Sequence, residues 1–125
     1  MTTRARFPWI LAAAIDAVLV IVFAAIGMMN HDGGLTAAGL ARVAWPFLAG
    51  AAIGWLVALA WRRPAAPLRT GAVVWILAVG AGMLLRVATG GGFAVSFLIV
   101  AALVLGVFLV GWRAVAALVA RLRRS

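Results

Sequence analysis

Four long apolar stretches, separated by short breaks rich in glycine, proline or polar residues, dominate the pattern of the chain. They cover about residues 8–29, 43–61, 71–88 and 93–112. A transmembrane helix needs about 20 mainly apolar residues, because a rise of about 1.5 Å per residue must cross a hydrocarbon core of about 30 Å. The pattern therefore predicts an all-α integral membrane bundle of four transmembrane helices, forming a single membrane domain over residues 1–125.

The start of the second helix has two interpretations. The apolar stretch can be extended outward through Leu40 to Thr36, a residue type that caps helix N-termini. Pro46 then lies inside the helix, where it removes a backbone hydrogen bond and kinks the helix near Arg42. If the helix begins at Trp45 instead, Pro46 is a first-turn proline with no mechanical consequence. The sequence leaves both alternatives open.

Composition excludes a water-soluble monomer and most catalytic chemistry. The chain is 68% hydrophobic and 10% charged, whereas soluble domains are about half apolar and a quarter charged. It has no cysteine and one histidine, so thiol chemistry is absent and a haem or zinc site lacks its usual ligands. Because no set of acid, base and nucleophile is visible either, we expect no catalytic residue, no metal, no cofactor and no enzymatic activity.

Arginine distribution predicts the orientation of the bundle. With both termini in the cytoplasm, nine arginines lie inside and only Arg42 and Arg86 outside, which fits the excess of positive charge on cytoplasmic loops. We therefore expect a multi-pass protein of the bacterial cytoplasmic membrane, N-in and C-in. Residues 113–125 are predicted to form a basic cytoplasmic tail, although the fourth helix can also continue along the surface through them.

The expected partners follow from this orientation. The net charge of +9 would attract anionic lipid headgroups at the cytoplasmic face. It does not indicate nucleic acid, because no basic stripe is interleaved with stacking aromatics. Tryptophans near predicted helix ends are expected to anchor the bundle at the two interfaces: Trp9, Trp45, Trp61, Trp75 and Trp112. Trp55, in the middle of a span, is the exception.

Small residues at four-residue spacing predict close helix packing. Helices in lipid associate through small side chains and a few polar contacts. The second stretch contains Gly50 and Gly54, the third pairs Ala78 with Gly82, and the fourth pairs Ala102 with Gly106. These positions are either the internal seams of one bundle or the surface of a homodimer.

Asp16 is the polar residue of greatest interest, because it lies about eight residues into the first span, where an ionised carboxylate is costly. No partner at its depth is evident. It is either a proton- or cation-coupled site or a neutral or hydrogen-bonded group that fixes helix packing. Arg42 and Arg86 are expected beside His31 and Asp32 at the outer face. That cluster is either an anion-binding or gating site or a set of arginines that snorkel to headgroups.

The chain resembles the family called domain of unknown function 3054, small and mainly actinobacterial membrane proteins. Four elements carry the resemblance, over about residues 9–113: AAAIDAVLVIVFAAIG with a histidine in the turn that follows, AWPFLAGAAIGWL, GAVVWILAVGAGMLLR and GGGFAVSFLIVAALVLGVFLVGWR. The resemblance implies four helices and no established activity. It suggests testing Asp16, His31, Trp45, Pro46, Arg86, Trp112 and Arg113. Ala78 departs from the polar threonine expected in the third span, which puts a polar pathway through that helix in doubt.

These features support two functional hypotheses. The first is a non-enzymatic structural or accessory bundle, or one that binds lipid or another apolar ligand, with a membrane-protein partner or as a homodimer. The alternative is a small proton- or cation-coupled transporter or channel that uses Asp16.

Overall fold

The computed structural model describes residues 7–29 and 35–124, and all regular structure in these two ranges is helical. Its long helices are α1 (Trp9–Met29), α2 (Ala37–Ala58), α3 (Val73–Ala88) and α4 (Val95–Arg124). Between α2 and α3 lie a 3₁₀ turn, η1 (Ala60–Arg62), and a π-helix, η2 (Pro67–Ala72), which runs directly into α3. In these ranges four helices are long and apolar enough to cross a membrane, with η2 and α3 counted together.

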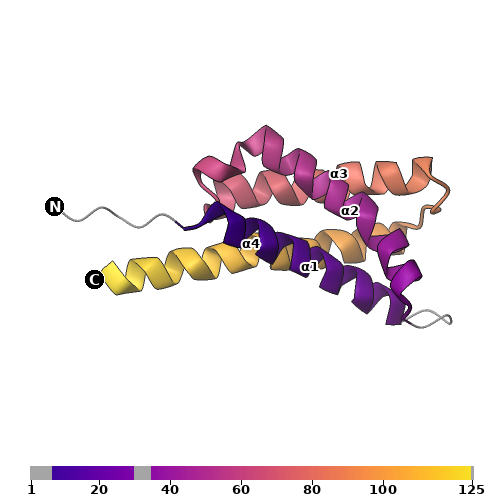
Figure 1. Ribbon diagram of the computed structural model, residues 1–125, viewed down its shortest axis with the longest axis horizontal. Coiled ribbons are helices and arrows are strands. Elements are labelled where there is room, and N and C mark those ends of the chain that lie inside the picture. The colour runs from indigo at the N-terminus through magenta and orange to yellow at the C-terminus, as the bar shows by residue number, and fades with distance from the viewer. Residues whose placement is uncertain (1–6, 30–34, 125) are drawn as a thin grey trace.

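The helices form a hairpin of α2 and α3 that lies over the pair α1 and α4 (Figure 1). The connection between α2 and α3 lies at the same end of the bundle as the C-terminus, and the turn from α3 to α4 lies at the other end (Figure 1). Within the two described ranges this arrangement confirms an all-helical chain with four membrane-length helices.

Thr36 decides how α2 begins. Its side chain accepts a hydrogen bond from the backbone N–H of Gly39 at 3.0 Å, so that α2 starts at Ala37. Pro46 is therefore a buried residue inside the helix, as in the first of the two alternatives. The helix ends at Ala58, earlier than the apolar stretch, because Leu59 adopts a left-handed conformation with a φ of 52°.

Glycines bring α2 and α3 into close contact. A Cβ atom on Gly50 would lie 2.7 Å from the carbonyl oxygen of Leu77, and one on Gly82 would lie 2.6 Å from the ring of Phe47. Gly54 is equally close to the backbone of Val74. Without these glycines the two backbones could not approach so closely, so the structure places all three in an internal seam.

A second seam joins α3 to α4 around Trp75. The indole lies against Gly106, where a Cβ atom would be 3.0 Å from the ring. Its N–H donates to the carbonyl oxygen of Ala102 at 2.8 Å. The interpretation of Trp75 as an interfacial anchor is therefore incomplete, because its polar atom is used between two helices.

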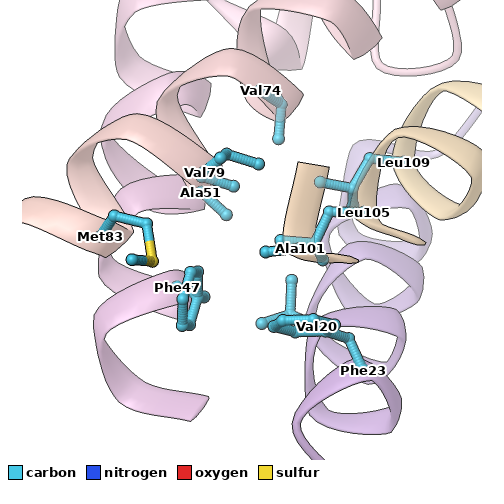
Figure 2. Packing of buried hydrophobic residues seen from close by; sticks show 11 residues of the cluster. Val20, Phe23, Phe47, Ala51, Val74, Val79, Met83, Ala101, Leu105 and Leu109 are labelled. Carbon is cyan, nitrogen blue, oxygen red and sulfur yellow. The ribbon is translucent and has the colours of Figure 1, made fainter. Parts of the chain in front are cut away.

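Side chains from all four helices fill the centre of the bundle (Figure 2). Phe23 of α1 meets the ring of Phe47 of α2 edge-on, with 5.3 Å between the ring centroids. The cluster contains Val20, Phe23, Phe47, Ala51, Val74, Ala78, Val79, Met83, Ala101, Leu105 and Leu109. Outside it, many large apolar side chains are exposed, as expected of helices that face lipid.

Helix α4 is longer than the predicted fourth span. The helix does not end near Trp112 but continues to Arg124. It therefore has 30 residues, which correspond to a length of about 45 Å. Arg113 is consequently part of the helix, and it is fully buried. The fourth helix therefore continues through residues 114–124, as in one of the two interpretations, and Arg113 is not an exposed tail residue.

Candidate functional site

Asp16 lies on the one face of α1 that the rest of the protein covers. The buried residues of α1 recur at three- and four-residue intervals, which places them in a single stripe along the helix: Ala12, Asp16, Val20, Phe23, Ala24 and Met28. Asp16 keeps 2% of its surface exposed. The carboxylate therefore points into the bundle.

Four donors surround the carboxylate of Asp16. On Oδ2 it accepts hydrogen bonds from Nη2 of Arg113 at 2.6 Å and from the indole N–H of Trp55 at 2.8 Å. On Oδ1 it accepts them from Nη1 of Arg113 at 2.9 Å and from the indole N–H of Trp112 at 2.8 Å. We call Asp16, Trp55, Trp112 and Arg113 the Asp16 cluster. It joins α1, α2 and α4 at one point.

Arg113 is held by more than its charge partner. Its Nε donates to the carbonyl oxygen of Pro64 at 2.8 Å, and Nη1 also donates to that of Leu109 at 2.8 Å. The guanidinium carbon lies 4.7 Å from the ring centroid of Trp112, a cation–π distance. Arg113 thus ties the connection between α2 and α3 to α4, beside the carboxylate of α1.

The π-helix η2 makes room for this arginine. A Cβ atom on Gly71 would lie 3.0 Å from Cδ of Arg113 and 3.4 Å from the carbonyl oxygen of Leu109. The neighbouring Thr70 is fully buried and donates its hydroxyl to the carbonyl oxygen of Arg63 at 2.6 Å. Single π-turns often occur at functional positions, and Gly71 lets this one pack closely against α4.

The structure corrects two expectations about this region and explains one exception. Asp16 does have a partner at its depth, since its bidentate ion pair with Arg113 is almost entirely buried. Trp55, the exception in the middle of a span, donates its indole N–H to that carboxylate. Trp112 was predicted to anchor the bundle at the membrane interface, yet its indole N–H donates to the carboxylate of Asp16.

The pairing was missing from the sequence interpretation, although one signal pointed to it. An indole N–H buried away from water usually finds an acceptor, so Trp55 in the middle of a span indicated an acceptor at that depth. The residue type of Arg113 gave no such signal, because an arginine after an apolar stretch is what a cytoplasmic helix end also contains; only the family resemblance put Trp112 and Arg113 among the positions to test. The contributions of Gly71 and of the Pro64 carbonyl were not visible at all.

The other predicted polar group lies at the opposite end of the bundle. Arg42 of α2 and Arg86 of α3 line one pocket of about 280 Å³, together with Val43, Trp45, Pro46, Thr89, Gly90 and Gly91. We call it the Arg42 pocket. His31 and Asp32, expected beside these arginines, lie outside the described residues.

Arg86 also borders a larger cavity between α1 and α4. This cavity, which we call the Arg86 cavity, has a volume of about 390 Å³. Its lining is apolar except for Arg86 and Ser96: Phe23, Ile26, Gly27, Arg86, Ala94, Ser96, Phe97, Val100 and Val104. A cavity of about 350 Å³ between α1 and α2 touches Asp16 and Trp55.

Within residues 7–29 and 35–124, these observations define four helices long and apolar enough to cross a membrane, a buried ion pair and a mainly apolar cavity. The family model described as "Protein of unknown function (DUF3054)" matches residues 13–116, and the chain belongs to that family. This confirms the resemblance carried by the four apolar elements. Searches of curated proteins and of solved structures found no match.

Proposed function

We propose that this protein is a non-enzymatic integral membrane bundle that binds an apolar ligand between α1 and α4. The Arg86 cavity carries the proposal. Its volume of about 390 Å³ falls within the range of about 300–1,000 Å³ that is typical of small-molecule sites. Its walls are aromatic and aliphatic, as ligand sites usually are, and one cation lies at its border.

The Asp16 cluster has a structural role in this proposal. Each carboxylate oxygen already accepts two hydrogen bonds, one of them from the guanidinium. The ion pair is neutral as a unit, and it joins α1, α2 and α4, so it holds α1 at a fixed rotation relative to the other helices. That rotation decides which residues of α1 face the Arg86 cavity.

The geometry gives less support to the transport alternative. A coupling carboxylate has to exchange a proton or cation with water, and intramembrane acids of that kind usually face a water-filled path. Asp16 borders a cavity lined mainly by alanine, leucine and tryptophan, and its oxygens are taken by four donors. Release of any one proton or ion would require Arg113 to move away first.

The proposed orientation places the end that carries the α2–α3 connection in the cytoplasm. In Figure 1 the C-terminus lies at this same end, and exposed arginines gather there: Arg62, Arg63, Arg69, Arg121, Arg123 and Arg124. Such a charge asymmetry favours a cytoplasmic location of this end in a bacterial plasma membrane and contact with anionic lipids. We propose that the bundle works as an accessory subunit beside a membrane-protein partner or a second copy.

Native mass spectrometry of gently extracted protein tests the binding proposal. A phenylalanine at Gly27 fills the Arg86 cavity, since a Cβ atom there meets only Phe97, at 4.0 Å. The matched control is Gly80→Phe, because a Cβ atom at Gly80 has nothing within 4 Å. We expect the wild type and the Gly80→Phe control to carry apolar adducts, and the Gly27→Phe variant to have lost them. Bare wild-type protein, or equal adducts on all three, would refute ligand binding in this cavity.

A further inference from the structure

Arg86 lies between two hollows that differ in their lining residues. On one side is the Arg86 cavity, whose walls are mainly apolar. On the other is the Arg42 pocket, which contains a second arginine and the glycine turn after α3. A single side chain therefore borders a space suited to hydrocarbon and a space suited to a polar group.

One N–H group of the Arg86 guanidinium lacks the kind of polar partner that Arg113 has. Its Nε is buried with no hydrogen-bond partner, whereas the corresponding Nε of Arg113 donates to a carbonyl oxygen. Within residues 7–29 and 35–124, the only acidic partner of an arginine is Asp16, which is taken by Arg113. An arginine at a helix end that simply reached headgroups would turn its N–H groups outward. A buried, unsatisfied N–H is costly and usually has an explanation.

The turn after α3 holds Arg86 in this position. A Cβ atom on Gly91 would lie 2.6 Å from Cγ of Arg86, so that only a glycine lets the chain close over the arginine stem. Gly90 and Gly92 have φ values of 85° and 77°, which favour glycine. The ring of Phe97, 4.6 Å below the guanidinium carbon, supports it from the other side.

The apolar walls extend away from Arg86 along α4. Phe97, Val100 and Val104 follow one another at three- and four-residue spacing, and Phe23 and Gly27 do so on α1. Two facing stripes of this kind, each one or two turns long, line the cavity over about 10 Å of helix length. A hydrocarbon chain that runs parallel to the helix axes fits this shape.

We propose that the ligand is a single-chain amphiphile with an anionic head, either a carboxylate or a phosphate. The head binds Arg86, with Arg42 beside it, and the tail lies between α1 and α4. Charge complementarity selects this ligand over a neutral one, because an anionic oxygen satisfies the buried N–H and forms the stronger, charge-assisted hydrogen bonds. The inference rests on the proposed function, since it specifies the ligand of the same cavity.

The test compares a long-chain polyene fatty acid with its methyl ester. Both probes fluoresce more strongly in apolar surroundings, and only the acid carries charge. The full-length protein in an uncharged detergent is titrated with each probe, as wild type, Arg86→Met, Arg86→Lys and Gly27→Phe. Arg62→Met is the control, because Arg62 is an exposed arginine far from the cavity. Circular dichroism checks that every variant remains helical.

We expect the wild type to bind the acid at least about tenfold more tightly than the ester, the difference typical of one charge-assisted contact. Arg86→Met should abolish the preference, whereas Arg86→Lys and Arg62→Met should retain it. Competition then separates the two head groups. If a single-chain phosphate lipid displaces the bound polyene acid at a lower concentration than a second fatty acid does, the head is a phosphate. If the fatty acid displaces it at the lower concentration, the head is a carboxylate.

Three results would overturn the inference in different ways. Equal binding of acid and ester that Gly27→Phe abolishes would reject the anionic head and leave the apolar cavity as proposed. Binding of neither probe, or binding that Gly27→Phe leaves unchanged, would reject the proposed function as well. An unchanged acid preference in folded Arg86→Met would show that another cation selects the head.

Discussion

Removing both members of the buried ion pair should destabilise the bundle by clearly less than the sum of the two single removals. Asp16→Asn keeps the size of the side chain and leaves the charge of Arg113 without a counterion in a site of 0% exposure. Arg113→Met keeps the apolar stem and leaves a carboxylate that two indoles still contact. The double variant has neither charge.

The magnitude follows from the burial of the pair. Breaking a buried ion pair from one side typically costs about 3–5 kcal/mol, because the remaining charge stays desolvated. A neutral interhelical hydrogen bond in a membrane protein contributes about 0.6 kcal/mol on average. We therefore expect each single variant to lose about 3–5 kcal/mol. The double variant should lose clearly less than the sum of the two, with a coupling energy of about 1–3 kcal/mol.

Unfolding of the purified protein in mixed micelles, by increasing the fraction of a denaturing detergent, measures these free energies. Circular dichroism follows helix content, and tryptophan fluorescence follows the cluster itself, since Trp55 and Trp112 both contact the carboxylate. Arg62→Met is the matched control for loss of an arginine, because Arg62 is exposed.

Two outcomes would refute this reasoning. If Asp16→Asn unfolds within about 0.6 kcal/mol of the wild type, the value of one neutral hydrogen bond, the ion pair does not hold the helices together. If the single losses simply add in the double variant, the two charges do not act as a unit. A stable Asp16→Asn variant that lost proton-dependent flux in vesicles would instead support the transport alternative.

Three further predictions concern the seams and the end of α2. Gly50→Leu should lower the unfolding free energy by about 1–3 kcal/mol or more, because the leucine overpacks against α3. Gly80→Leu, on an open face, should leave it within about 0.5 kcal/mol of the wild type. Equal effects of the two variants would contradict a close seam between α2 and α3. Leu59→Gly should raise the unfolding free energy by about 1 kcal/mol in the same assay, because the residue has a φ of 52°. Trp75→Phe should lower it by about 0.5–1.5 kcal/mol through loss of the indole hydrogen bond to α4; no change would show that the bond makes no net contribution.

Several properties of this protein follow from its sequence alone. The number and approximate bounds of the membrane-length helices come from apolar length, which counts residues along one segment and needs no contact between segments. The cap at Thr36 is local too, because its hydroxyl bonds to an N–H three residues away, but the sequence offered it only as one of two alternatives. The small residues Gly50, Gly54, Gly82 and Gly106 indicated close helix packing. The four apolar elements of the sequence were enough to indicate the family.

The tertiary structure decided how these helices are rotated against one another. In a water-soluble protein, polar residues mark the side of a helix that faces solvent, so the opposite side is the buried one. In lipid, the interior of the bundle and its surroundings are both apolar, so the sequence pattern of a helix specifies its rotation poorly. That rotation determines that Asp16 meets Arg113, 97 residues later in the chain. It also leaves a cavity between α1 and α4 that ends at Arg86. Both depend on contacts between distant segments, which only the packed bundle contains.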